Sequence, residues 1–282
     1  MHVETVALLT ALLAVGSFAA GLLGSLTGLG GGVVLIPMLT LLFGVDLRYA
    51  IGASLVSIIA TSSGAASAYV REGYTNVRLA MLLEIATSLG AILGAALAAY
   101  ADTKWIGLLF GLVLAHSAWS ALRSQPSDQP LAETANGFVS RLRLNGTYPA
   151  DGQSCAYSVQ RLPLGALLMG VAGILSGLLG IGSGALKVIA MDRIMRLPFK
   201  VSTTTSNFMI GVTAAASAGI YLGRGYIDPG LAMPVMLGVL AGSFAGARIL
   251  SVAPANYLRR IFGIVIAAMS IQMIYSSLTG KL

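Results

Sequence analysis

Long apolar runs separated by short polar segments dominate this chain of 282 residues. A helix needs roughly 18 or more mostly apolar residues to cross the hydrocarbon core of a membrane. Only 10% of the residues are charged, whereas a soluble domain of ordinary composition carries about 25%. The runs of sufficient length are Thr5–Leu26, Ile51–Val70, Leu79–Tyr100, Trp105–Leu122, Val201–Leu222, Gly230–Ser251 and Ile261–Leu278. The sequence therefore predicts an all-α polytopic membrane protein.

The charged and sulfur-containing residues exclude several classes of function. The net charge of +7 is scattered over short segments between the apolar runs. A nucleic-acid partner would need one continuous basic face, so none is expected. The single cysteine, Cys155, argues against a disulfide or a cysteine-based zinc site, and His2 and His116 are too few for a histidine-rich centre. We expect no metal, no cofactor and no cleaved signal peptide, because the first run lacks a basic segment before it.

A polar stretch rich in Pro, Ser, Asp, Asn and Gly divides the chain into two halves. The expected organisation is a first transmembrane repeat over 1–122, a polar cytoplasmic linker over 123–162 and a second transmembrane repeat over 163–282. A shift of 152 residues places "YVREGYTN" on "YLGRGYID", and the glycine cluster "GLGGG" on "GIGSG". These matches at one offset predict an internal repeat, and inverted repeats are a common design of transporters.

In each half, an apolar segment leads into the glycine cluster and a shorter one leaves it. The shorter segments, Val33–Phe43 and Ala185–Met195, have 11 residues each. A helix of that length rises about 16 Å, roughly half of the hydrocarbon core. We therefore expect each half to begin with a broken re-entrant helical hairpin, followed by three transmembrane helices.

The positions of Lys and Arg favour this arrangement. If each hairpin region crossed the membrane once, the positive charges would divide into 8 and 9 between the two sides. If both hairpins re-enter, 12 charges face one side, 4 face the other and Lys187 lies inside the membrane. Lys and Arg concentrate in cytoplasmic loops. We therefore expect two inverted repeats, a cytoplasmic linker and both termini outside.

The stretch Gly180–Ala185 matches the dinucleotide-binding pattern G-x-G-x-x-A, and Lys187 follows it. A dinucleotide site needs a strand before the glycines, but Leu164–Leu179 has the pattern of a long apolar helix. A phosphate-binding loop would need Gly-Lys-Ser/Thr at the correct spacing, and this stretch lacks it. We therefore reject a nucleotide site.

Two interpretations of the glycines remain. Small residues let membrane helices approach closely, and this is the role expected of Gly90, Gly94, Gly242 and Gly246. At the hairpin tips the alternative is an anion site, because half-helices that begin there direct free N–H groups and positive dipole ends at the membrane midplane. Two such tips facing each other would hold one anion from both sides.

Polar side chains follow both glycine clusters. The stretch "VSTTTSNF" carries six consecutive polar residues, and "IGASLVSI" carries two serines. Their hydroxyl groups can donate to an anion, or they can bond back to carbonyls of their own helix. We expect Thr204 and Asn207 to contact the anion. The candidate substrate-binding residues are Gly30, Gly31, Gly32, Ser54, Ser57, Gly182, Ser183, Gly184, Lys187, Thr204 and Asn207.

Two charged residues stand inside the predicted membrane segments. Lys187 lies one turn into the second half-helix, where the first half has Leu35. A charge at this depth costs at least about 2.5 kcal/mol unless it is paired or hydrated. Lys187 can counter the charge of the substrate, pair with an acid or extend to the membrane surface. Glu84 can carry a coupled proton, pair with Lys187 or lie at the interface.

The paired motifs resemble the TauE/SafE family of sulfite exporters. They stand here as "GSLTGLGGGVVLIP" with "YAIGASLVSI", and as "GLLGIGSGALKV" with "KVSTTTSNF". The resemblance covers nearly the whole chain except residues 123–161. It implies a carrier of the plasma (inner) membrane that exports sulfite or small organosulfonate anions by alternating access, with the proton gradient as a candidate driving force. Ser183 replaces one glycine of the second motif, and "KVI" replaces the "LIP" of the first, so both departures lie where substrate would bind.

Other classes of function fit the sequence less well. A passive anion channel would be distinguished from a carrier only by whether anion flux is coupled to the movement of a second ion. An intramembrane enzyme would need acids, histidines or a Ser–Lys pair at catalytic spacing, and Glu84 and Lys187 do not supply such a set. A scaffold protein needs no central polar site. We expect no enzymatic activity, and the expected partners are a small sulfur-containing anion and the lipid bilayer.

Overall fold

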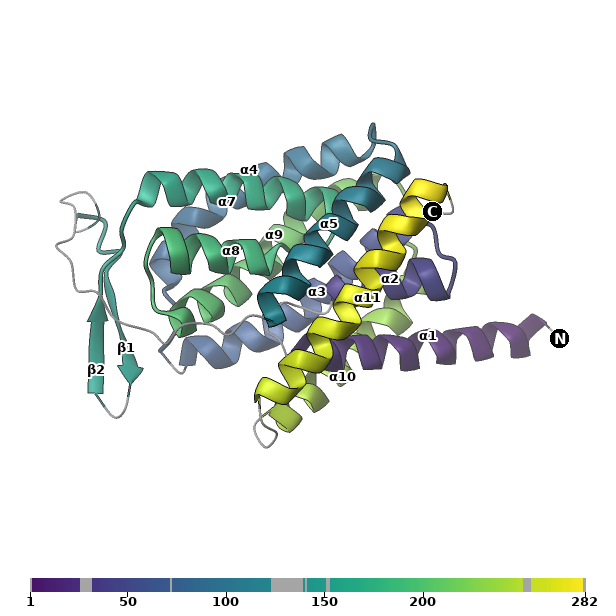
Figure 1. The fold of residues 1–282 in the computed structure, drawn as a ribbon, viewed down its shortest axis with the longest axis horizontal. Coiled ribbons are helices and arrows are strands. Elements are labelled where there is room, and N and C mark those ends of the chain that lie inside the picture. The colour runs from purple at the N-terminus through teal and green to yellow at the C-terminus, as the bar shows by residue number, and fades with distance from the viewer. Residues whose placement is uncertain are drawn as a thin grey trace.

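The computed structural model describes residues 2–25, 32–71, 73–122, 139, 141–150, 153–250 and 255–280, and these are mostly helical (Figure 1). The first half contains α1 (His2–Ser25), α2 (Gly32–Pro37), η1 (Met38–Leu42), α3 (Leu47–Arg71), α4 (Val77–Ala98) and α5 (Thr103–Leu122). The second half contains α7 (Leu162–Leu179), α8 (Gly184–Ile189), η2 (Ala190–Ile194), α9 (Phe199–Gly223), α10 (Pro229–Leu250) and α11 (Ala255–Thr279). An antiparallel hairpin of β1 (Gly146–Ala150) and β2 (Gln153–Tyr157) lies between the halves.

The bounds of the helices recur from one half to the other. Both the first and the last residues of α3 and α9 are 152 positions apart, which is the offset found in the sequence. The same holds for α2 and α8, for η1 and η2, and for α4 and α10. Gly73 and Gly225, which follow α3 and α9, both have positive φ, +77° and +76°. Glycine adopts this conformation at no steric cost, so the same residue makes the same turn twice.

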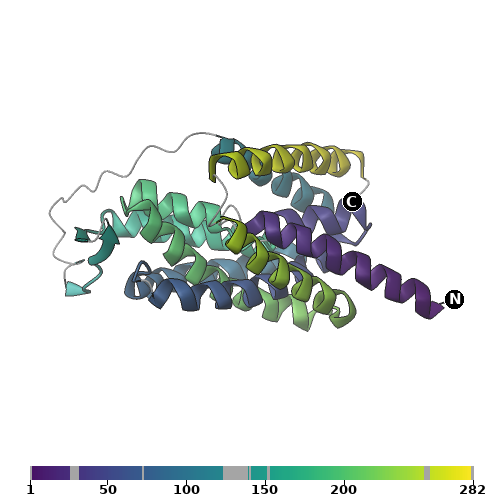
Figure 2. The ribbon, with the colours of Figure 1, turned by 90° about the horizontal axis from the view of Figure 1, so that it is seen from below.

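The long helices pack in pairs, each with a helix of the other half. Helix α1 packs along α10 and α7 along α4, while α3 packs on α9 and α5 on α11 (Figures 1 and 2). Arg48, at the start of α3, contacts the ring of Tyr226, which follows α9. Lys200, at the start of α9, contacts the ring of Tyr74, which follows α3. Helices α3 and α9 therefore run antiparallel, and the two halves interlock.

Glycines allow the closest of these helix contacts. A Cβ atom at Gly90 or Gly94 of α4 would collide with carbonyl oxygens of α7, and one at Gly242 of α10 would collide with the carbonyl of Phe18 in α1. Gly246 is buried in α10. The packing role predicted for Gly90, Gly94 and Gly242 is thus confirmed, because backbones approach this closely only where a side chain is missing.

The apolar helices are those of a multi-pass membrane protein. Among the described residues, three helical stretches are long and apolar enough to cross a membrane: α4, α7 and Pro229–Gly246 of α10. Shorter apolar stretches occur in α1, α2 with η1, α3 and α11. The run Val201–Leu222 was expected to be a span and lies in α9, but its polar residues 202–207 make it less apolar. Many large apolar side chains point outward, among them Leu8, Ile85 and Ile271, as a surface in contact with lipid requires.

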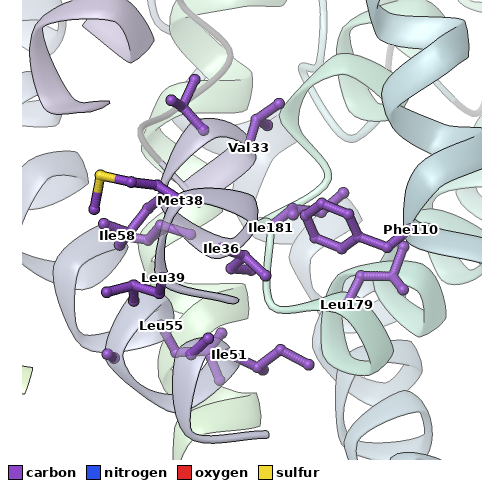
Figure 3. Close-up of a cluster of buried hydrophobic side chains, with 14 of the residues drawn as sticks. Val33, Ile36, Met38, Leu39, Ile51, Leu55, Ile58, Phe110, Leu179 and Ile181 are labelled. Atoms are coloured by element: carbon purple, nitrogen blue, oxygen red, sulfur yellow. The ribbon is translucent and has the colours of Figure 1, made fainter. Parts of the chain in front are cut away.

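The main apolar core surrounds the first half-helix. All six residues of α2 are buried. The core formed by α2 and its neighbours draws on both halves and includes Val33, Ile36, Leu39, Ile51, Leu55, Ile58, Phe110, Leu179 and Ile181 (Figure 3). Ile181 lies in the turn after α7 and Phe110 lies in α5, so this core joins the second hairpin to the first half.

A second core fixes part of the linker to the helices. Tyr148 and Tyr157 of the β-hairpin are buried in a cluster that also contains Leu79 of α4 and Met195, which follows η2. The amide of Asn76 donates to the hydroxyl oxygen of Tyr157 at 3.0 Å. Burial raises the pKa of the Tyr157 hydroxyl, and the hydrogen bond from Asn76 partly offsets this. The linker therefore contains a small folded element in addition to polar chain, and this hairpin projects from one end of the molecule while the start of α1 extends from the other (Figures 1 and 2).

Candidate functional site

The turn between α7 and α8 contains three residues in the left-handed conformation. Gly180 ends α7 with φ +66°, and its N–H donates to the carbonyl of Ser176 at 2.8 Å. Gly182 and Ser183 follow with φ +70° and +44°, and α8 begins at Gly184. Glycine is the residue that this geometry favours. Ser183 is therefore strained where a glycine would not be.

The chain folds back on itself after this turn. The N–H of Gln160, just before α7, donates to the carbonyl of Met195, just after η2, at 3.1 Å. Along α7, a Cβ atom at Gly165 would meet the side chain of Met195. The end of η2 therefore lies beside the beginning of α7, and α7, α8 and η2 form a broken hairpin.

The glycine segment of the first half reaches this turn. Gly30 and Gly31 lie outside the described residues, but Gly32 begins α2. A Cβ atom at Gly32 would lie 2.6 Å from Oγ of Ser54 and 3.4 Å from the carbonyl oxygen of Gly180. The hydroxyl of Ser54 donates to that same carbonyl at 2.9 Å. The start of α2 and the second turn are thus in direct contact.

Ser206 makes a related contact in the second half. It stands 152 positions after Ser54, and its hydroxyl donates to the carbonyl of Gly184 at 3.1 Å. Both serines are buried. The two long helices α3 and α9 therefore each fix one backbone carbonyl of the second tip, and they do so from the same position in the repeat. Among the predicted residues, the structure brings together Gly32, Ser54, Gly182, Ser183 and Gly184.

Lys187 is joined to Glu84 by a threonine. Lys187 is 0% exposed, and its ammonium donates to Oγ1 of Thr213 at 2.5 Å. Oγ1 of Thr213 lies 2.7 Å from Oε1 of Glu84, to which it can donate. Ser88 donates to the same carboxylate oxygen at 2.8 Å. The structure thus links Lys187 and Glu84 in one hydrogen-bonded chain through Thr213.

Several buried polar atoms of the second hairpin and of Glu84 lack a partner. Within the described part of the chain, Oγ of Ser183, Oγ of Ser176 and Oε2 of Glu84 have no hydrogen bond. Ser183 is 3% exposed, so bulk water does not solvate it. A buried polar group without a partner costs about 1–3 kcal/mol. Such costs are expected where a ligand supplies the missing partner.

Other predicted residues are placed less favourably for contact with a ligand. The hydroxyl of Ser57 donates to the carbonyl of Ala53 at 2.9 Å, and that of Thr204 donates to the carbonyl of Lys200 at 2.9 Å. These are the bonds back to the same helix that the sequence left as the alternative. Asn207 is half-buried and makes no side-chain hydrogen bond to the described residues.

Sequence reasoning missed Thr213. The signal for it is a polar stripe on α9, where Thr205, Thr213, Ser217 and Tyr221 are all buried and lie on one face at a spacing of four or eight residues. Positions four apart on a helix share a face. A search for polar residues at this spacing, continued past Asn207, would have found Thr213 because it lies on the same stripe.

No metal centre is evident in the part of the chain that the structure describes, where no group of three or more His, Cys, Asp or Glu residues gathers. Among the described residues, the charged side chains that are buried are those of Glu84 and Lys187. Hydroxyl groups, an ammonium group and a carboxylate suit an anion and a proton better than a metal cation.

The apolar helices, the interlocked halves and the buried charges define a multi-pass helical membrane protein. The chain belongs to the TauE/SafE family, because the family described as "Sulfite exporter TauE/SafE" matches residues 12–273. The resemblance seen in the sequence is thereby confirmed.

Curated relatives cover nearly the full length of the chain. It is 28% identical over 267 residues to "Probable membrane transporter protein YunE" of Bacillus subtilis (strain 168). This match covers 92% of the present chain and 95% of the relative. The chain is 27% identical over 263 residues to "Probable membrane transporter protein" of Xylella fastidiosa (strain 9a5c), with 92% and 91% covered. No solved structure matches the chain. The family and these relatives indicate a membrane transporter rather than an enzyme.

Proposed function

We propose that this protein is a secondary transporter that exports sulfite or small organosulfonate anions across the plasma membrane by alternating access. The observation that carries the proposal is the placement of polar groups at the second tip, the turn from Gly180 to Gly184. A fully buried Lys187 stands one turn behind Ser183, whose buried hydroxyl has no partner among the described residues. One cationic donor and one neutral donor of this kind are what a small anion needs.

The anion is held between the two glycine-rich tips. Helix α8 continues directly into η2, so the half-helix runs from Gly184 to Ile194. Its first N–H groups and its positive dipole end lie at the tip, where an anion is stabilised. Gly30 and Gly31 belong to the proposed site on the strength of the sequence. Ser54, Ser57, Thr204 and Asn207 complete the proposed lining.

The two halves act as inverted repeats with re-entrant hairpins. The antiparallel course of α3 and α9 supports this, and so does the division of Lys and Arg into 12 and 4. On this arrangement residues 1–122 and 163–282 form the two repeats, and residues 123–162 form the cytoplasmic linker. Movement of one repeat against the other opens the tip to each side in turn. Glu84 is the proposed site of proton coupling.

Flux into proteoliposomes tests the proposal. The panel is sulfite, sulfoacetate, thiosulfate, sulfate and chloride, each with and without an imposed pH gradient. Wild-type protein is compared with Lys187→Leu, which copies Leu35 of the first half, and with Arg193→Leu. Arg193 is an exposed cation six residues further along the same half-helix, so this variant is a matched control for loss of a positive charge.

We expect saturable flux of a sulfur anion, lost in Lys187→Leu and retained in Arg193→Leu. Passive chloride flux that does not saturate would instead identify an anion channel. Absence of flux for every anion would leave the glycine tips as packing elements and end the proposal.

A further inference from the structure

Lys187, Thr213 and Glu84 form one buried unit that comes from three helices. Lys187 belongs to α8, Thr213 to α9 and Glu84 to α4. Lys187 is 0% exposed, Thr213 0% and Glu84 9%. A lone buried charge is strongly unfavourable, so a lysine and a glutamate this deep are stable together as a neutral pair. The threonine hydroxyl accepts from the ammonium and can donate to the carboxylate.

Both charged ends of this unit have unused hydrogen-bonding capacity. An ammonium has three N–H donors, and Thr213 is the partner that Lys187 has within the described residues. The remaining donors can bind an anion. On the carboxylate, Oε1 is held by Thr213 and Ser88, whereas Oε2 is buried and has no partner in the described part of the chain. That oxygen can accept a proton.

We propose that an anion and a proton bind to this unit together and cross the membrane in the same direction, one proton per univalent anion, so that the outward gradient of the anion drives export against an inward proton gradient. The inference rests on the proposed function. When an anion binds to Lys187, it neutralises the ammonium charge that otherwise balances the carboxylate of Glu84. The site then carries one uncompensated negative charge in a region of low dielectric constant. A proton on Oε2 of Glu84 restores neutrality. Each of the two ligands therefore favours the binding of the other.

The proton step needs water alone as its source and acceptor. A hydronium ion on the open side transfers its proton to Oε2 of Glu84 and becomes water while the anion occupies Lys187. When the anion leaves on the other side, the ammonium balances the carboxylate again, and the proton returns to water there. The unit is neutral in both forms, so net charge does not have to cross the membrane, where each charge is costly.

Other charged groups are placed away from the unit. Helix α7 packs on α4 and has no titratable side chain between Leu162 and Leu179. Helix α9 carries Lys200 and Tyr221 near its two ends, and α4 carries Arg78 at its start. On η2, Asp192 and Arg193 follow Lys187 by more than one turn. Helix α3, which packs on α9, carries Arg48 at its start.

Thr213 is the positioning residue of this unit. Its hydroxyl has a single hydrogen, which either donates to Glu84 at 2.7 Å or bonds back to the carbonyl of Met209 at 3.0 Å. Switching between these acceptors loosens the link between Glu84 and Lys187 without moving a helix. Thr87 of α4 offers a matched control, because it is also 0% exposed and, within the described residues, its hydroxyl bonds to the helix carbonyls of Leu83 and Glu84.

The experiment measures proton movement that follows an imposed anion gradient. Proteoliposomes contain a pH-sensitive dye, start without a pH gradient, and have the membrane potential clamped with potassium and valinomycin. The outer anion is ethanesulfonate or thiosulfate, neither of which carries a proton near neutral pH. Sulfite is the third anion. Because sulfite and hydrogensulfite coexist at the outer pH, the proton carried by hydrogensulfite is subtracted from the measured proton entry. Anion entry and internal pH are followed together.

For wild-type protein with ethanesulfonate we expect the interior to become more acidic, at an initial rate equal to that of anion entry. Glu84→Gln should slow anion entry and abolish the acidification that accompanies the entry that remains. Thr213→Val should lower the protons moved per anion several-fold, whereas Thr87→Val should match the wild type. Anion entry in the wild type without acidification, or with alkalinisation, overturns the inference. Acidification that persists in Glu84→Gln also overturns it. Absence of entry by all three anions contradicts the proposed function itself.

Discussion

Leu35 and Lys187 occupy the same position in the two half-helices, 152 residues apart, and both side chains are 0% exposed. Around Leu35 the neighbours are apolar, and Val33 and Ile36 belong to the same core (Figure 3). Around Lys187 they are Thr213 and, beyond it, Glu84. The two half-helices thus occupy equivalent positions, but the second has polar neighbours, to which Glu84 of the first half contributes.

The first prediction concerns the stability of the buried pair. Lys187→Leu should lower the stability by about 3–5 kcal/mol, because it leaves Glu84 buried without its cation. The double variant Lys187→Leu with Glu84→Leu should recover most of this loss, since replacing both members of a buried pair by apolar groups is often neutral. Thermal unfolding in detergent measures both. A double variant that is less stable than Lys187→Leu would show that the pair is not a coupled unit.

The second prediction concerns the contact between α4 and α7. Gly94→Val should disrupt this contact, because a Cβ atom there collides with the carbonyl of Ile174. We expect a loss of stability of at least about 2 kcal/mol, as for other overpacked sites. Gly219→Ala on α9 is the control, since no atom lies within 4 Å of a Cβ atom at Gly219. It should be neutral or should stabilise by up to about 1 kcal/mol. Equal melting temperatures for the two variants would contradict the packing account.

The third prediction concerns the strained turn. Ser183 has φ +44° and stands where the first half has Gly31. Ser183→Gly should stabilise the protein by about 1 kcal/mol, because it removes the left-handed strain and an unpaired buried hydroxyl. The same change should weaken anion binding, since the hydroxyl is a proposed donor. Melting temperature and the half-saturating anion concentration for flux are measured together. A gain in stability without loss of affinity would remove Ser183 from the site.

The fourth prediction concerns the two ends of the α3–α9 pair. Arg48 lies over Tyr226 and Lys200 lies over Tyr74, with 5.6 Å from the cation to the ring centre in both cases. Arg48 also donates to the hydroxyl of Tyr226 and the carbonyl of Ala101. If the two repeats alternate, Arg48→Ala should expose the tip to one side of the membrane and Lys200→Ala to the other.

Labelling of Ser54→Cys in a Cys155→Ser background tests this fourth prediction with a reagent that does not cross membranes. We expect Arg48→Ala to raise the labelling rate several-fold from one side, and Lys200→Ala to raise it from the opposite side. Arg141→Ala, in the linker, is the control. An increase from the same side for both variants would contradict opposite gates.

The family, the packing role of several glycines and the predominantly helical class followed from the sequence, because hydropathy and repeated glycine motifs are local signals. The sequence itself shows motifs that recur at an offset of 152 residues, and the helix bounds recur at the same offset. The β-hairpin was not foreseen. Tyr148 and Tyr157 are buried against residues such as Leu79 of α4, and a contact over that sequence separation leaves no local pattern.

The site was harder to predict than the fold. Glu84 and Lys187 could be chosen because charges are rare in apolar helices. Their link through Thr213 depends on the packing of α4, α8 and α9, which the sequence does not state. Thr204 was favoured because it stands in a polar run, yet its hydroxyl bonds to the carbonyl of Lys200. A hydroxyl group can reach a ligand only if it lies on a side of its helix that no neighbouring helix covers, and this depends on the packing of the helices.

The central claim is that the anion binds at the second tip, between Ser183 and Lys187. Crystals grown with a bromine-labelled alkylsulfonate test it most directly, because anomalous scattering locates bromine without regard to the surrounding structure. We predict a peak beside these two side chains that is absent from crystals of Lys187→Leu. A peak confined to the lipid-facing surface, or one that persists beside Ser183 in Lys187→Leu, would contradict the claim.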